Sequence, residues 1–417
     1  MSRLKKQLSN KFNLILFLIF LLAVIFLPKG GLQGDYEYYI RWIDWMRESG
    51  LANIYAMQEV NYFPIFLYIL YFLSVVIRDL VVLAANIYLV KIFILAFDFA
   101  AIFLVGNLLK KLNKSPFLSF LILFNPAFFF NSLLWGQIEA LYIFFIAAAF
   151  LAVIYKHTNL SVFCYVLAFY SKLQAIIFLP GLVLLLLPFY LRNRKLLLQT
   201  FGVAVATNVV LLLPFVLNGS LNQMYANVFS SIDMFAVLSN NAFNFWILFL
   251  GPFEAGSPDS AKLLFLSFKQ WGMLLFALSS FIILLPLLIR LLKKEKIAQK
   301  LAAGFISLVF LINGLISLVF FFFNTQMHER YLQPTILFFW ISLILKPSKL
   351  LAVIYGLTSV AFVLNLERVI KYFNLGIYDT ILFSSRISAL MFLVALILGL
   401  YYVIKNYLLY HRAVKSG

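Results

Sequence analysis

The sequence contains few charged residues, and acidic residues are the rarest of them. Only 12% of its 417 residues are charged, and 15 acidic residues compare with 33 basic ones. Soluble domains contain about 25% charged residues. Hydrophobic residues make up 64% of the chain, and apolar runs approaching about 20 residues recur from end to end. This composition excludes an ordinary soluble domain and indicates a protein that crosses a membrane several times.

Cysteine and histidine are also scarce. The single cysteine, Cys164, excludes an internal disulfide and any multi-cysteine metal site. His157, His328 and His411 are the only histidines and lie far apart, so the sequence contains no local zinc motif. No soluble stretch is large enough to bind nucleic acid, and the net charge of +18 arises from basic loops and termini that follow the positive-inside bias. We therefore expect no nucleic acid partner.

Continuous apolar runs predict helices rather than the strands of a membrane barrel. The alternating pattern of about 10 residues that marks such strands does not occur in the sequence. No small-residue cleavage site follows Pro28, so the first helix is expected to remain uncleaved. We predict an all-α, polytopic membrane helix bundle that forms a single transmembrane domain, residues 1–417. The predicted crossings, about twelve in all, cover residues 12–28, 82–108, 116–133, 137–155, 159–171, 172–189, 196–217, 269–291, 298–323, 331–345, 348–365 and 386–407.

The distribution of lysines fixes the predicted orientation. With the N-terminus inside, a crossing at residues 64–77 would place Lys110, Lys111 and Lys114 outside, against the positive-inside rule. We therefore predict that residues 64–77 lie in the interface or re-enter, and that residues 29–80 form the first external loop with interfacial or re-entrant helices. The same orientation places the unusual polar clusters on the non-cytoplasmic side of a multi-pass plasma-membrane protein. These clusters are the loop around Asp35 and residues 135–139, 170–174, 239–244 and 327–331.

Asp35 lies just beyond the first predicted span and precedes an amphipathic segment, residues 36–49. Charged residues in this segment share one helical face, which suits a helix in the membrane interface with its aromatic residues at headgroup depth. Asp35 is either only the N-cap of this helix or an interfacial acid that accepts a proton from an incoming hydroxyl, and the two roles are compatible. The charged face contains Glu37, Arg41, Asp44 and Glu48, and the apolar surface contains Tyr39, Ile40, Trp42, Ile43 and Met46.

Three cationic side chains are candidates for binding a phosphate. Lys172 lies between two short apolar runs, where it either reaches to water or binds a lipid phosphate. His328 and Arg330 open a predicted span, and a guanidinium recognises phosphate with a bidentate fork. The alternative is an interface belt in which Arg330 pairs with Glu329. Adjacent helical residues point about 100° apart, so we expect these two residues to have separate partners.

A second cluster is centred on a proline-containing span. Pro126 is expected to kink this helix, and Gly136 permits close packing or the close approach of a substrate. Trp135 and Gln137 flank this glycine. Glu139 is a further candidate acid or metal ligand, and ordinary helix packing is the alternative for the whole cluster.

Taken together, these stretches resemble the bacterial integral-membrane mannosyltransferases related to the second mannosyltransferase of GPI-anchor synthesis, which belong to the GT-C class of glycosyltransferases. The resemblance covers residues 34 to about 331. In such proteins the acid after the Gly-Gln pair is more often Asp, and here it is Glu139. The motifs that carry the resemblance are Gly34-Asp35-Tyr36, Asn61-Tyr62-Phe63-Pro64, Phe97-Asp98, Asn125-Pro126, Trp135-Gly136-Gln137 with Glu139, Ser171-Lys172-Leu173-Gln174-Ala175, Asn241-Ala242-Phe243-Asn244-Phe245-Trp246 and Met327-His328-Glu329-Arg330-Tyr331.

The resemblance implies a GT-C-like fold and a transferase that acts on the non-cytoplasmic face. The donor would be a polyprenyl-phosphate sugar such as polyprenyl-phosphomannose or dolichyl phosphate mannose, and the acceptor a glycan or glycolipid. Such enzymes invert the anomeric carbon, and Asp35 matches their catalytic base. By charge and placement, Lys172, His328 and Arg330 would bind the donor phosphate. Some enzymes of this class use a divalent cation and others do not, so that cofactor stays open. The sugar or acceptor pocket would include Glu37, Trp135, Gln137, Glu139, Gln174, Asn241, Asn244 and Glu329.

Two other classes of protein are alternatives. A secondary transporter would carry ionisable residues near the middle of the membrane and often shows inverted repeats. The sequence shows no internal repeat, and Asp98 is the clearest acid inside a predicted span. Another lipid-linked glycan enzyme, a ligase or polymerase, would share the external arginine and histidine but would not need a base in the first loop.

Overall fold

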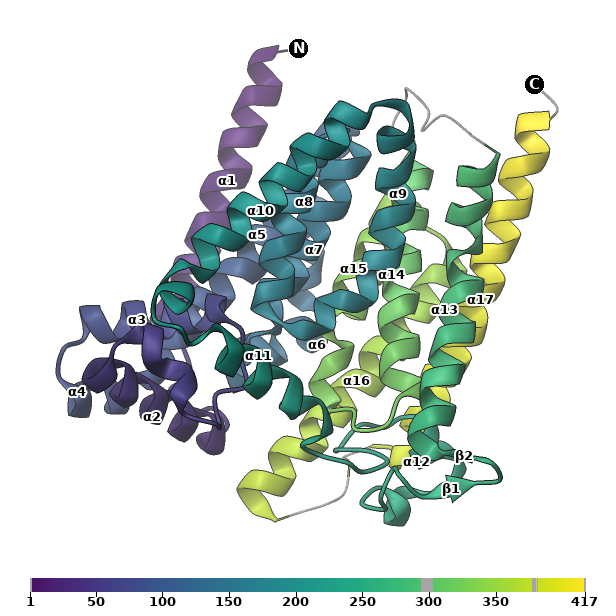
Figure 1. The fold of residues 1–417 in the computed structure, drawn as a ribbon. Coiled ribbons are helices and arrows are strands. Elements are labelled where there is room, and N and C mark those ends of the chain that lie inside the picture. The colour runs from purple at the N-terminus through teal and green to yellow at the C-terminus, as the bar shows by residue number, and fades with distance from the viewer. Residues whose placement is uncertain (1, 294–302, 377–379, 381, 416–417) are drawn as a thin grey trace. The chain divides into compact units, whose positions relative to one another are not determined.

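The computed structural model describes residues 2–293, 303–376, 380 and 382–415, and most of them are helical (Figure 1). The only strands among these residues are β1 (Lys262–Leu263) and β2 (Leu266–Ser267), which pair as an antiparallel hairpin. The predicted all-α class is therefore confirmed. The first residues of one predicted crossing, 298–302, lie outside the described residues.

Many of the described helices are long and apolar enough to cross a membrane. Seven helices meet this criterion, and there is an eighth if a bent pair of segments counts as one span. Four shorter apolar helices contain 10–17 residues each. The chain is thus an integral, polytopic membrane protein, while the count of about twelve crossings stays a prediction. The seven long helices cover Ile87–Lys111, Leu173–Arg192, Arg194–Leu217, Phe268–Leu292, Ala303–Phe323, Lys349–Phe373 and Ser385–Asn406.

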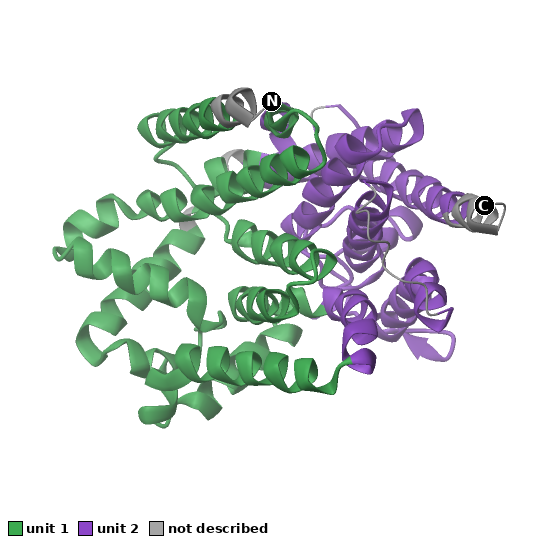
Figure 2. Cartoon of the chain, turned by 90° about the horizontal axis from the view of Figure 1, so that it is seen from above, with its two compact units in different colours: residues 1–121, 129–176, 193–234 green, residues 122–128, 177–192, 235–417 purple. Residues whose placement is uncertain are grey.

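The chain divides into two compact units, drawn in two colours in Figure 2. Unit 1 contains residues 1–121, 129–176 and 193–234, and unit 2 contains residues 122–128, 177–192 and 235–417. Three short helices cross a boundary between the units: η3 (Pro116–Phe124), α6 (Pro126–Phe129) and η5 (Leu173–Phe178).

Unit 1 has one hydrophobic core that joins residues 33–89 to its long helices. Buried residues of α2, α3, α5, α7, α8, α10 and α11 form a single cluster, and α7 packs along α8 and α5. The helices of this unit are α1 (Ser2–Ile25), α2 (Gln33–Ser49), η1 (Leu51–Ala56), α3 (Pro64–Val76), α4 (Leu80–Ala85), η2 (Ile87–Leu89), α5 (Val90–Lys111), η4 (Phe130–Trp135), α7 (Glu139–Ile154), α8 (Thr158–Ser171), α10 (Arg194–Leu217), α11 (Leu221–Ser230) and η6 (Ser231–Asp233).

Unit 2 is arranged around α14 (Ala303–Phe323), the most buried of the seven long helices. This helix packs against α13, α15 and α17, and α16 packs against α15 and α17. The remaining helices of the unit are α9 (Leu179–Arg192), α12 (Phe245–Phe249), η7 (Pro252–Glu254), α13 (Phe268–Leu292), η8 (Glu329–Leu332), α15 (Gln333–Leu345), α16 (Lys349–Leu375) and α17 (Ser385–Lys415).

The predicted amphipathic segment is helical, but its apolar face is covered by protein. It corresponds to α2, in which Glu37 and Arg41 are exposed. Tyr39 and Trp42 are only 1% and 2% exposed and belong to the core of unit 1. The apolar surfaces of α2 and α3 bury each other, so these aromatic residues pack on protein, and the headgroup depth of the helix stays a prediction.

Two further features of the helices, one predicted and one not, have local causes. The span that contains Pro126 breaks at Asn125 with a bend of 81°, which confirms the kink. Helix α16 runs to Leu375, ten residues past its predicted end at residue 365, although this extension carries charge. An i,i+4 ion pair between Glu367 and Lys371, at 3.2 Å, supports the extension.

Candidate functional site

Asp35 lies in the first turn of α2 and is half-buried. The helix begins at Gln33, and its N-cap position, Leu32, makes no side-chain cap, so the interpretation of Asp35 as an N-cap is wrong. A carboxylate in the first turn of a helix is stabilised in its charged form by the helix dipole. The position of Asp35 therefore favours an ionised acid at the edge of unit 1.

Gln137 orients the Asp35 carboxylate. Its side-chain amide donates a hydrogen bond to Asp35 Oδ2, and the Gln137 side chain is fully buried. The backbone N–H of Gln137 donates to the carbonyl of Asn131 at 2.9 Å. The backbone of Gln137 is thus held by its own turn. The Asp35 carboxylate accepts a hydrogen bond from this residue, which lies about a hundred positions further along the chain.

Gly136 makes this turn possible. Its φ of 82° is in the left-handed region, where it ends the π-helical turn η4. A Cβ at this position would lie 3.0 Å from the Tyr36 hydroxyl oxygen and 3.4 Å from Lys91 Cε. Glycine is therefore required both by the backbone conformation and by the close approach of α2.

Tyr36 follows Asp35 and lies against the same turn. Burial, and then the negative charge of Asp35, raise the pKa of Tyr36 well above its usual value. The phenol therefore keeps its proton at physiological pH, beside the carboxylate of the preceding residue.

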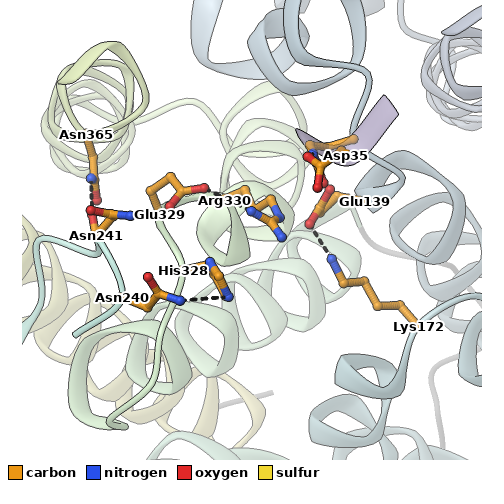
Figure 3. Close-up of polar contacts among 10 residues, drawn as sticks. Asp35, Glu139, Lys172, Asn240, Asn241, His328, Glu329, Arg330 and Asn365 are labelled. Carbon is orange, nitrogen blue, oxygen red and sulfur yellow. Dashed lines mark hydrogen bonds and ion pairs between the residues drawn. The ribbon is translucent and has the colours of Figure 1, made fainter. Parts of the chain in front are cut away.

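Glu139 and Lys172 form a buried ion pair in unit 1, which Figure 3 shows. Their side chains are 0% and 6% exposed. Glu139 lies in the first turn of α7 and Lys172 is the C-cap of α8, so each charge also complements the dipole at its helix end. Only Ile138 separates Gln137, the partner of Asp35, from Glu139, the partner of Lys172. The four residues therefore form one group. We call Asp35, Gln137, Glu139 and Lys172 the unit 1 cluster.

Three other predicted pocket residues of unit 1 have different surroundings. Glu37 is exposed on α2. Trp135 is 1% exposed, and its indole N–H has no hydrogen-bond partner among the described residues. Gln174 is half-buried in η5, two residues beyond Lys172.

Lys91 is a polar residue that the sequence analysis did not select. Its side chain is 0% exposed, and its ammonium donates to the carbonyls of Pro28 and Leu134 at 3.0 Å each and to that of Gly30. The sequence feature that could have indicated Lys91 is a lone lysine inside an apolar run, because ionisable residues there are rare and need partners.

In unit 2, His328 is held by Asn240 and by aromatic rings. The Asn240 amide nitrogen lies 3.2 Å from His328 Nε2, and the Asn240 N–H donates to the Met327 carbonyl at 3.0 Å. Phe235 and Tyr331 contact the imidazole edge to face, with ring centroids 5.2 and 5.1 Å away.

Arg330 pairs with its neighbour Glu329, contrary to the expectation of separate partners. The Arg330 Nη1 atom lies 3.2 Å from Glu329 Oε1. Two features of the structure account for the error. Both residues belong to the 3₁₀ helix η8, and Glu329 is 1% exposed, so its buried carboxylate needs a nearby cation. Asn240, His328, Glu329 and Arg330 are the unit 2 cluster (Figure 3).

Asn241 and Asn244 shape the loop beside this cluster. Asn241 has a φ of 68°, and its carbonyl accepts a hydrogen bond of 2.6 Å from Asn365 of α16. Asn365 also accepts from the Phe243 N–H at 2.9 Å and was missed by the sequence analysis. The Asn244 side chain caps α12 and donates to the Asn324 carbonyl. Asn244 therefore fixes the start of α12, and its role in a sugar or acceptor pocket stays a prediction.

No known protein-family model matches the chain, and no curated protein matches it in sequence. The functional argument therefore rests on the two clusters. Among the described residues, no group of three or more His, Cys, Asp or Glu side chains could hold a metal ion.

Proposed function

We propose that the protein is a glycosyltransferase of the GT-C class, with about twelve crossings, that transfers mannose from a polyprenyl phosphate to a glycan or glycolipid acceptor on the non-cytoplasmic face. The observation that carries the proposal is the half-buried Asp35 carboxylate, held at a helix N-terminus by the Gln137 amide. Asp35 would act as the base of an inverting transfer.

The proposed step needs only one carboxylate. Asp35 takes the proton of the acceptor hydroxyl as the acceptor oxygen bonds to the anomeric carbon. The bond from that carbon to the phosphate oxygen breaks, and the polyprenyl phosphate leaves with the electron pair. Phosphate is a stable anion, so no second carboxylic acid has to protonate the leaving group. Glu139 is paired with Lys172 inside the protein, which leaves Asp35 as the better base of the unit 1 cluster.

Lys172 of the unit 1 cluster is proposed as a ligand of the donor phosphate, and for His328 and Arg330 of the unit 2 cluster that role stays a prediction from the sequence. Negative charge grows on the leaving phosphate, and fixed cations stabilise it more strongly in the transition state than in the ground state. Lys172 would act as an ammonium anchored by Glu139. Within unit 2, the Arg330 guanidinium is anchored by Glu329.

Replacement of Asp35 tests the proposed base. Wild-type protein in liposomes with a polyprenyl-phosphate mannose should transfer sugar to a glycolipid acceptor. We expect Asp35→Asn to lower kcat by about 100-fold or more while the donor still binds, because general base catalysis typically contributes factors of this size.

Asp44→Asn is the matched control, since Asp44 lies on the same helix but makes no contact with Gln137. It should keep wild-type activity. Full activity of Asp35→Asn would remove the base from the proposal and favour a lipid-linked ligase or polymerase.

A secondary transporter is the second candidate, and one observation favours it. Asp98 is 3% exposed inside α5, where an ionisable group is expensive to bury and is often part of an ion or proton pathway. Flux of an ion or sugar across the liposome membrane, without any transfer to the acceptor, would support this candidate instead.

A further inference from the structure

The buried lysine of α5 lies between the two segments that carry Asp35 and its partner. Lys91 contacts Pro28 and Gly30, which precede α2, and Leu134, which precedes the Gly136 turn. These are the segments that lead into Asp35 and Gln137. We propose that Lys91 is a positioning residue that sets the geometry of the hydrogen bond between Asp35 and Gln137. The catalytic part of this inference rests on the proposed function.

The hydrogen bonds of Lys91 require its charged form. A neutral lysine amine has two N–H groups and an ammonium has three. Three carbonyl oxygens accept from Lys91 Nζ, so all three N–H groups of an ammonium are used. Carbonyl oxygens carry partial negative charge and compensate the cation without an acidic partner. The Lys91 ammonium therefore links two backbone segments through hydrogen bonds to three carbonyl oxygens.

These contacts are well placed to hold Asp35 in one orientation. Residues 26–32 contain no regular helix, and Lys91 donates to two backbone carbonyls within this segment. On the other side, the left-handed Gly136 lies against both Lys91 and Tyr36. Movement of either segment would shift Asp35 relative to the Gln137 amide. Displacements of about 1 Å at a reacting group can lower a rate by about 100-fold.

Two measurements on Lys91→Met test the inference, since methionine keeps the length of the side chain and removes its charge and donors. The first is independent of activity. Spin labels at Gly34→Cys and Leu160→Cys, in a Cys164→Ser background, report the position of the start of α2 relative to α8. Both sites are exposed, and a side chain at Gly34 meets open space. We expect a clearly broader distance distribution in Lys91→Met than in the parent chain.

The second measurement is the steady-state transfer reaction of the unlabelled protein. We expect kcat to fall by about 10- to 100-fold while the KM for the donor changes less than about threefold, because a displaced base affects the chemical step. Lys110→Met is the matched control. Lys110 is also on α5 and also makes several contacts, to Ser9, Asn13 and Asn107, but it touches neither segment of interest. It should leave both readouts unchanged.

The outcomes separate the inference from the proposed function. An unchanged distance distribution in Lys91→Met overturns the positioning role, whatever the activity. A broadened distribution with no transfer by the wild-type protein supports the positional part and contradicts the transferase. A broadened distribution with an unchanged kcat overturns the catalytic part alone. If Lys91→Met does not fold, Lys91→Gln keeps an amide donor at the same position, and the same comparisons apply to it.

Discussion

At the scale of single residues, the two acids of the unit 1 cluster differ in their burial and in their partners. Asp35 is half-buried and accepts a hydrogen bond from a neutral amide, whereas Glu139 is fully buried and paired with a cation. A buried ion pair costs desolvation on both sides, and its charges are needed mainly to compensate each other. The environment therefore suits Asp35 for proton transfer and Glu139 for holding Lys172.

The pair between Glu139 and Lys172 should show strong coupling in a double-mutant cycle. Glu139→Gln and Lys172→Met should each lower the free energy of unfolding by about 3–5 kcal/mol, since each leaves an uncompensated buried charge. The double variant should recover most of this loss. The free energies can be measured by steric trapping in bicelles. Additive losses would mean that the two charges do not stabilise each other.

At the scale of elements, the ends of helices carry most of the chemistry. The first turns of α2 and α7 bear Asp35 and Glu139, and the C-cap of α8 is Lys172. In each case the sign of the charge matches the helix dipole. The turn between η4 and α7 completes the arrangement, because it directs the Gln137 amide toward α2.

The Gly136 turn should not tolerate a side chain. Gly136→Ala should lower the free energy of unfolding by about 1–3 kcal/mol, because alanine is strained at a positive φ and its Cβ would press on Tyr36. It should also reduce transfer activity by displacing Gln137.

Gly202→Ala in α10 is the control for this glycine. A Cβ there meets open space, and alanine favours the helix by about 0.5–1 kcal/mol. Unfolding in denaturant measures both variants. Equal stability of the two alanine variants would show that the Gly136 turn adapts to a side chain.

At the scale of the whole molecule, the proposed function depends on which membrane face carries Asp35. The positive-inside rule predicts that Asp35 is outside and that the basic residues after α5 are inside, provided that α3 does not cross. The α3 helix has 13 residues, fewer than the roughly 20 that span a bilayer core.

Cysteine labelling tests this orientation in intact cells. In a Cys164→Ser background, Gly34→Cys should react with a membrane-impermeant maleimide, and Lys111→Cys should react only after permeabilisation. Both positions are exposed in the structure. Reaction of both cysteines from the outside would show that α3 crosses the membrane.

The helices were predictable because each is a continuous apolar run. Most observed bounds differ from the predicted ones by a few residues, and the larger differences include the start of α1 at Ser2 and the ends of α16 at Leu375 and of α17 at Lys415. Contacts between distant segments were harder to predict. The sequence indicated Asp35, Gln137 and Glu139 as candidates, but not the bond between Asp35 and Gln137. Lys91 and Asn365 were missed because their partners are backbone groups of distant segments, which the sequence does not identify.

The sequence by itself determined the class of this protein: an all-α, polytopic membrane protein with scarce acids and short basic loops. Hydrophobic length and charge bias are local properties, and they decide membrane insertion before any tertiary contact forms. Only the tertiary structure decided that the aromatic face of α2 is buried, that Arg330 pairs with Glu329, and that Lys91 ties two segments together. These outcomes depend on desolvation and on partners far away in the chain, so they follow from the packing of the helices.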